Sequence, residues 1–223
     1  MRTLQVLSGV LLAAAAVAAV VVALTASGGK APVPVHTLLA GIPQSGTRLG
    51  ASGAPVRLQY YGDLECPVCR SFSLNTLSQL IERDVRQRRL QITFHSAQSA
   101  THDAAVFRTQ QVAALAAGRQ DHAWDYVELF YNEQGLEGTG YVNEAFLRGI
   151  AGQIRGLDLA RWQLDRGAAA LASEAASDQR TALAGGFTVT PTLVISGPNG
   201  TAAPISGDPS YGAVEQAIHT VGG

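Results

Sequence analysis

The feature that most constrains the fold of this chain is a pair of cysteines, Cys66 and Cys69, with two residues between them. Residues 56–61 have the alternating, tyrosine-rich pattern of a strand, and Gly-Asp-Leu-Glu then interrupts it. Across 66–88, apolar residues recur at helical spacing, and 91–95 predict a second strand. The cysteines therefore lie at the start of a helix in a predicted β–α–β unit.

Two cysteines in this position favour redox chemistry over a structural crosslink. A disulfide that closes so short a loop restricts the unfolded chain only slightly. The N-terminus of a helix carries partial positive charge, which favours the thiolate of Cys66, the form that attacks disulfides. Cys69, one turn further along, can release a mixed disulfide by intramolecular attack. Pro67 fits the first turn, where its missing N–H costs no hydrogen bond. We therefore predict Cys66 and Cys69 as the catalytic pair.

A zinc site is the main alternative for such a pair. Zinc usually takes four protein ligands, and the sequence has no second Cys-x-x-Cys and no His-x-x-x-His. His95 and His102 could complete a set of four only at a spacing that matches no zinc finger. An inert pair of cysteines is the remaining alternative. We expect a redox pair that needs neither a metal nor another cofactor.

The rest of the sequence predicts a helical block and then a β–β–α end. A Pro-Asn-Gly turn at 198–200 indicates a hairpin between the last two strands. Asp158 is a predicted N-cap. The expected helices cover 104–117, the region around 124–130, 143–154, 159–164, 168–184 and 211–221, and the expected strands 192–195 and 202–206. The expected fold class is α/β.

Three motifs occur along this pattern. Tyr-Gly-Asp-Leu-Glu-Cys-Pro-Val-Cys covers 61–69, Trp-x-Tyr-x-x-x-Phe covers 124–130, and Thr190-Pro191 precedes a late strand. Together they resemble the DsbA-like branch of the thioredoxin superfamily, from Val56 to the end of the chain. The resemblance implies a DsbA-like thioredoxin domain over 54–223, with a helical subdomain inserted at about 97–186.

The resemblance also implies a substrate site. In the family, the peptide bond before the equivalent of Pro191 is cis, and the loop faces the cysteine pair. A substrate strand would pair with the backbone there, so we expect Thr190, Pro191, Pro67 and Val68 to contact substrate. An X-Pro bond can adopt the cis form at modest cost. The alternative is an ordinary trans proline at the start of a strand.

Val68 departs from the strong oxidants of the family, which carry histidine at this position. Valine cannot stabilise a thiolate through its side chain, and Glu65 would oppose the ionisation of Cys66 if it lay close. We therefore expect a milder oxidant. Asp63 and Glu65 are the candidates for proton transfer, although Asp63 could equally be a turn residue.

The N-terminus predicts an export segment. Arg2 precedes an unbroken apolar run from Val10 to Leu24. With the apolar residues before it, the run approaches the roughly 20 residues that span a bilayer. Residues 1–26 are predicted to be a transmembrane anchor or a signal peptide, and a buried core helix is a less favoured interpretation. Residues 27–53, rich in Gly, Pro and Ser, are predicted to be a linker. Arg2 on the short side predicts that the domain is extracytoplasmic.

Composition and motifs together define the expected function. A net charge of −1 gives no basic field for nucleic acid. We expect a cell-membrane thiol–disulfide oxidoreductase, or a secreted or periplasmic one if the N-terminal segment is cleaved, that oxidises cysteine pairs in exported proteins. The resemblance implies a quinone-linked membrane partner that reoxidises it. The alternatives are a disulfide reductase or electron donor to another thiol system, and a non-catalytic binding module that uses the groove beside Pro191.

Overall fold

The computed structural model describes residues 34–222, and every structural statement below concerns these residues. The predicted anchor or signal peptide, residues 1–26, lies outside them. Within 34–222, no helix combines the length and the apolar character that crossing a membrane requires.

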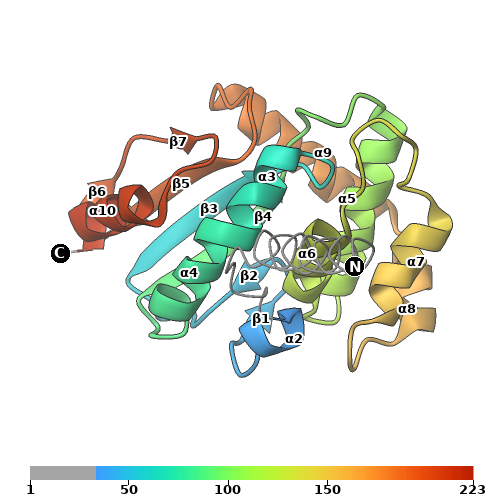
Figure 1. The fold of residues 1–223 in the computed structure, drawn as a ribbon, viewed down its shortest axis with the longest axis horizontal. Coiled ribbons are helices and arrows are strands. Elements are labelled where there is room, and N and C mark those ends of the chain that lie inside the picture. The colour runs from blue at the N-terminus through green and yellow to red at the C-terminus, as the bar shows by residue number, and fades with distance from the viewer. Residues whose placement is uncertain (1–33, 223) are drawn as a thin grey trace, which may run out of the picture. The chain divides into compact units, whose positions relative to one another are not determined.

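A seven-stranded sheet lies at the centre of the domain (Figure 1). The strand order is β1-β2-β4-β3-β5-β6, and β7 also pairs with β5. β3 and β4 are parallel, which confirms the predicted β–α–β unit. The predicted late strand is present as β5 and runs antiparallel to β3. The strands are β1 (Gln44–Ser45), β2 (Arg48–Leu49), β3 (Val56–Gly62), β4 (Leu90–Ser96), β5 (Thr192–Gly197), β6 (Gly200–Thr201) and β7 (Ile205–Ser206).

The last predicted strand is only partly present. Two strands of two residues each, β6 and β7, replace the single strand expected over 202–206. Pro204 lies between them and has no N–H for a ladder hydrogen bond, so a continuous strand is interrupted there.

The crossover from β3 to β4 is a helical stretch in which α and π geometry alternate. Ser78 Oγ donates to the carbonyl oxygen of Ser73 at 3.0 Å, within this stretch. Arg88 has a φ of 61°, so the helix ends before it, slightly earlier than predicted. The segments are α3 (Pro67–Phe72), η1 (Ser73–Leu77), α4 (Ser78–Leu80) and η2 (Ile81–Val85).

The prediction of a linker over 27–53 is wrong from residue 35 onwards. Val35–Leu38 form helix α2, and β1 and β2 make a hairpin whose second strand pairs with β4. The guanidinium of Arg86 donates to the carbonyl oxygens of Leu38 and Ala40, at 2.8 and 2.9 Å. The segment is therefore part of the domain. Its elements are too short to leave a periodic pattern in the sequence.

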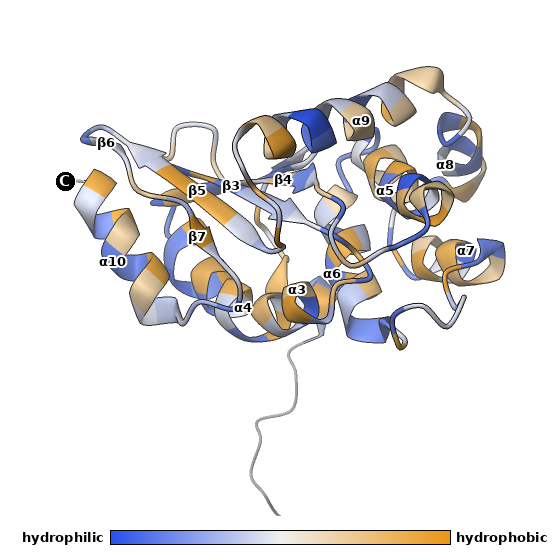
Figure 2. Ribbon diagram, turned by 90° about the horizontal axis from the view of Figure 1, so that it is seen from above, coloured by the Kyte–Doolittle hydropathy of each residue, from blue (hydrophilic) through white to orange (hydrophobic). Residues whose placement is uncertain are grey.

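Five helices lie between β4 and β5, where the inserted subdomain was expected. They are α5 (Ala104–Gly118), α6 (Ala123–Glu133), α7 (Glu144–Gly152), α8 (Leu159–Asp165) and α9 (Ala169–Ala184). Asp158 caps α8, as predicted. The C-terminal helix α10 (Tyr211–Gly222) and α4 lie on one face of the sheet, and α9 lies on the other (Figure 2). The end of β3 is thus enclosed by helices, and the cysteines follow directly after it.

Candidate active site

Cys66 and Cys69 lie at the beginning of α3, just after β3. Cys66 is the N-cap residue, and its Sγ accepts a hydrogen bond from the backbone N–H of Cys69 at 3.4 Å. Pro67 occupies the first turn, as predicted. Both cysteines are free thiols here. Cys66 is 3% exposed and Cys69 is 0% exposed, so their accessibilities differ only slightly.

The surroundings of the two sulfurs differ much more than their exposure does. A hydrogen bond from the Cys69 side chain lowers the pKa of Cys66 to about 6, with help from Thr190 and from the backbone amides of Cys69 and Val68. Burial raises the pKa of the Cys69 thiol well above its usual range. At neutral pH the pair therefore holds a thiolate at Cys66 and a thiol at Cys69.

Val68 contributes to this site through its backbone. The sequence argument considered only its side chain, which cannot stabilise a thiolate. Its amide nevertheless helps to lower the pKa of Cys66. The side chain is 40% exposed, and Val189, next to Thr190, is 50% exposed. The site thus has apolar side chains at its rim.

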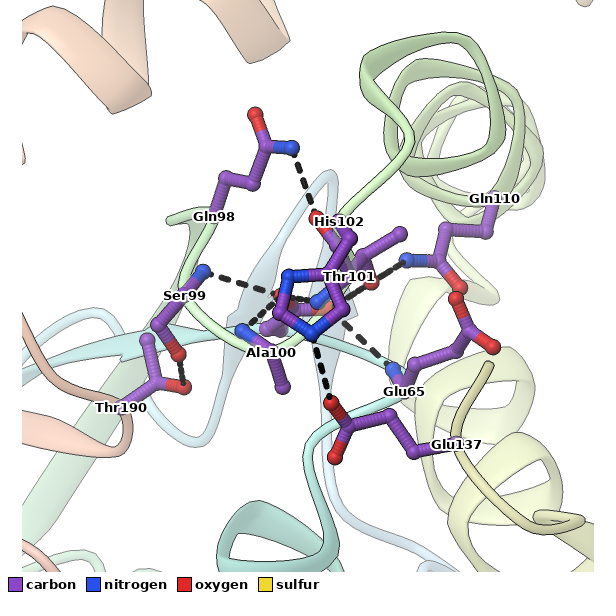
Figure 3. Close-up of polar contacts among 10 residues, drawn as sticks. Glu65, Gln98, Ser99, Ala100, Thr101, His102, Gln110, Glu137 and Thr190 are labelled. Atoms are coloured by element: carbon purple, nitrogen blue, oxygen red, sulfur yellow. Dashed lines mark hydrogen bonds and ion pairs between the residues drawn. The ribbon is translucent and has the colours of Figure 1, made fainter.

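The Thr190–Pro191 loop contacts the cysteine pair directly. Its peptide bond is cis. Cys66 Sγ is 3.4 Å from the carbonyl oxygen of Thr190, to which the protonated form of Cys66 donates a hydrogen bond. The hydroxyl of Thr190 also hydrogen-bonds with that of Ser99, which ties this loop to the segment after β4 (Figure 3). The structure therefore brings together the four predicted positions at 66, 69, 190 and 191.

Asp63 makes a set of contacts with a neighbouring loop that the sequence did not predict. Its fully buried carboxylate accepts hydrogen bonds from the backbone N–H groups of residues 99–101, at 3.0, 3.0 and 2.8 Å. It also accepts from the N–H of Glu65, the hydroxyl of Thr101 and the amide of Gln110. Both carboxylate oxygens therefore accept hydrogen bonds. The Asp63 side chain thus holds the 99–101 loop against the beginning of α3.

Glu65 is also buried, at 5% exposure. Burial raises its pKa, and hydrogen bonds with the Gly138 backbone and the Thr101 side chain offset this only in part. A higher pKa reduces the negative charge that was expected to oppose the ionisation of Cys66. The structure places Glu65 near the 99–101 loop, where Figure 3 shows it together with Thr101 and Glu137.

Two residues outside the motifs complete the surroundings of the site. Gln134, at the C-terminal end of α6, donates to the carbonyl oxygens of Leu64 and Cys66, at 2.7 and 3.2 Å. No local sequence signal indicates this contact. Both ring nitrogens of His95 are engaged, one with Asp178 and the other with Gln59. Both ring nitrogens of His95 are thus held by side chains of the fold.

The family model described as thioredoxin matches residues 44–214. The chain belongs to the thioredoxin family. This match covers the cysteine pair, the helical insertion and the Thr190–Pro191 loop. None of the curated proteins matches the chain in sequence.

Solved structures with the same fold include BdbD and several proteins named DsbA. BdbD from Bacillus subtilis matches with a TM-score of 0.68 and 18% identity, covering 79% of this chain and 94% of its own. DsbA2 from Pseudomonas aeruginosa matches with a TM-score of 0.64 and 22% identity, covering 80% and 94%. The thiol–disulfide exchange protein α-DsbA2 from Wolbachia pipientis matches with a TM-score of 0.62 and 15% identity, covering 80% and 86%. The domain therefore has the DsbA-type thioredoxin fold.

The charge state of the pair predicts a pH profile for alkylation. Iodoacetamide should label Cys66 of the reduced protein with a rate that is half-maximal near pH 6, because the thiolate is the reactive form. The rate should reach its plateau about two pH units higher, where nearly all of the thiol is ionised. Cys69 should remain unlabelled over this range, as mass spectrometry of the peptides can show. A midpoint near 9, the ordinary value for a thiol, would contradict the geometry described above.

Proposed function

We propose that the chain is a protein disulfide oxidoreductase that oxidises cysteine pairs in exported proteins through Cys66 and Cys69. The observation that carries this proposal is the position of Cys66. Its sulfur lies at a helix N-terminus, with a pKa lowered to about 6 by hydrogen bonds from the Cys69 and Thr190 side chains and from backbone amides. A thiol in such surroundings is a good leaving group and a good nucleophile.

In the oxidising direction, the reaction begins with the Cys66–Cys69 disulfide. A substrate thiolate attacks Cys66 Sγ, a substrate–Cys66 disulfide forms, and Cys69 leaves with the electron pair and takes up a proton. A second substrate thiolate then attacks the substrate sulfur of that mixed disulfide. Cys66 leaves as a thiolate. The substrate has lost two electrons and gained a disulfide, and the enzyme dithiol has gained the two electrons.

The direction of electron flow follows from which form of the pair is stabilised. Hydrogen bonds that stabilise the Cys66 thiolate stabilise the reduced enzyme, and a stable reduced form makes the disulfide a stronger oxidant. The contacts from Cys69, Thr190 and the Val68 amide all act in this sense. They favour the oxidase over the alternative of a reductase.

Location and partners complete the proposal. The apolar run that follows Arg2 supports an anchor in the cell membrane, with the domain outside, where disulfides persist. Each turnover leaves the enzyme reduced, so a partner must withdraw two electrons, and a quinone-linked membrane protein is the partner we propose. A reporter enzyme that is active only outside the cytoplasm, fused after Gly223, tests the orientation. Loss of reporter activity in an otherwise stable fusion contradicts it.

The redox potential of the pair tests the function. Equilibration of the full-length chain with glutathione should give a potential clearly less negative than the value of about −270 mV for thioredoxin. A value at or below that of thioredoxin would favour the reductase. If the cysteines did not exchange with glutathione at all, the chain would be a binding module, and the proposed function would be wrong.

A further inference from the structure

A pocket lined by four arginines lies at the end of the domain away from the cysteines. It has a volume of about 810 Å³, and its walls come from the β1–β2 hairpin, the starts of β3 and β4, and the end of the crossover helix. Arg57 is near the start of β3 and Cys66 follows its end, so roughly 20 Å of strand separates the two sites. Figure 1 shows α2, β1 and β2 away from α3. The four arginines are Arg48, Arg57, Arg86 and Arg88.

Neutral groups hold three of these arginine side chains in place. The guanidinium of Arg57 donates to the side-chain oxygen of Gln91 and, at 3.0 Å, to the carbonyl oxygen of Ser52. Arg86 donates to the two carbonyl oxygens at the end of α2. Arg48 donates to a hydroxyl of its own hairpin at 3.4 Å. Uncharged acceptors orient a guanidinium without neutralising it, so the fold positions these groups and leaves their charge available.

Acidic side chains compensate little of this charge. Among the described residues that line the pocket, none is aspartate or glutamate. Within residues 34–222, the only ion pair of the four arginines joins Arg86 to Glu82, at 3.7 Å, and the Glu82 side chain is 48% exposed. An ion pair this exposed is screened by solvent. A concave surface with such an excess of positive charge concentrates anions.

Arg88 occupies a backbone position that glycine usually fills. It follows the end of the crossover helix, where its N–H donates to the carbonyl oxygen of Val85, and its φ is 61°. Glycine is common at such positions because it has no Cβ to oppose the left-handed conformation. The Arg88 side chain is exposed, so it adds little packing that could offset this strain. This supports a role for Arg88 in binding rather than in stability.

We propose that the four-arginine pocket binds phosphate groups. A guanidinium presents its N–H donors in a planar fork that matches two phosphate oxygens. Ligand pockets have volumes of roughly 300–1,000 Å³, so this one has room for a diphosphate or a phosphate ester and not only for inorganic phosphate. The inference goes beyond the exchange function and does not depend on it.

Two sources share this chemistry, a soluble phosphate compound and the headgroup of an anionic lipid. The membrane anchor that we propose at residues 1–26 would keep the second source close. Residues 27–33, which connect the proposed anchor to the described domain, span at most roughly 25 Å when fully extended. The experiment therefore carries one probe for each source.

Isothermal titration calorimetry of the full-length chain in a nonionic detergent measures the binding. The probes are diphosphate and dihexanoyl phosphatidylglycerol, with dihexanoyl phosphatidylcholine as the lipid of zero net charge. Wild type should bind diphosphate, the phosphatidylglycerol or both, and should bind phosphatidylcholine more weakly than phosphatidylglycerol. Higher ionic strength should raise the Kd, because salt screens exposed guanidinium groups.

The variant that tests the pocket is Arg48→Gln/Arg88→Gln, because both side chains are exposed. Its Kd should rise at least about tenfold, since two charged donors are lost. Arg83→Gln/Arg180→Gln is the matched control, because it removes two exposed arginines that do not line the pocket, one of them 4.8 Å above the ring of Tyr211. The control should bind as wild type does.

Alkylation of Cys66 reports whether each variant is folded. The midpoint should stay near pH 6, because the substituted arginines lie at the other end of β3. If the double variant does not fold, Arg88→Gln replaces it, with an expected rise in Kd of about fivefold.

The outcomes decide both the site and the source of the phosphate. Diphosphate binding that the pocket variant loses supports a soluble ligand, and loss of phosphatidylglycerol binding alone supports a lipid headgroup. If neither probe binds wild type, or if the pocket variant and the control bind equally, the pocket is not a phosphate site. Failure of wild type to exchange disulfides would refute the proposed function and leave this inference standing.

Discussion

Replacing Cys69 with alanine should make the protein accumulate covalent complexes with substrate, whereas replacing Cys66 should abolish them. Cys69→Ala removes the side-chain hydrogen bond that lowers the pKa of Cys66 most, but the Thr190 side chain and the backbone amides of residues 68 and 69 remain, so the Cys66 thiolate can still attack a disulfide. The mixed disulfide then lacks the sulfur that would release it. In Cys66→Ala, the remaining thiol is fully buried and its pKa lies well above the usual range, so it neither attacks nor is attacked.

The measurement is a non-reducing gel after incubation of each variant with a test protein that carries a disulfide. Cys69→Ala should show a band at the summed mass that disappears on reduction. The double variant Cys66→Ala/Cys69→Ala serves as the control for noncovalent association. If Cys66→Ala formed as much covalent complex as Cys69→Ala, the different roles that we assign to the two sulfurs would be wrong.

Replacing Asp63 with asparagine should destabilise the domain by about 1–3 kcal/mol for each buried donor left without an acceptor, although the two side chains have nearly the same shape. The groups that hydrogen-bond to this buried carboxylate are all donors, including the N–H groups of Ser99, Ala100 and Thr101. An amide directs its NH₂ group at some of them, and those buried donors lose their acceptor. Because the same loop is tied to Thr190, exchange should slow as well.

Urea unfolding of the reduced protein measures this effect, with Asp103→Asn as the matched control. Asp103 caps α5 and accepts from the N–H groups of Ala105 and Val106, in an exposed position. Asparagine is about as good an N-cap as aspartate, so the control should change stability by only a few tenths of a kcal/mol. Equal effects of the two substitutions would show that Asp63 is an ordinary turn residue.

The sequence predicted those features that depend on neighbouring residues in the chain, namely the helices, the strands and the position of the cysteine pair. The period of apolar residues predicted the β–α–β unit and most helices to within a few residues, because each helix or strand must turn its own apolar face inward. The cysteine spacing and Pro67 placed the two cysteines at the first turn of a helix, which the structure confirms. The resemblance added the loop around Thr190 and Pro191, whose distance from Cys66 no local pattern could have indicated.

Tertiary structure decided which side chains meet. The Thr190 carbonyl lies 124 residues from Cys66 in sequence. Such contacts leave no period in the sequence, because each partner satisfies the pattern of its own helix or strand and only the packing of those elements brings them together. The packing of the chain likewise brings Asp63, in the turn after β3, to the backbone N–H groups of residues 99–101, a contact that no local pattern indicates. The sequence alone determined where the sulfur chemistry lies, and the fold determined which groups stabilise each sulfur.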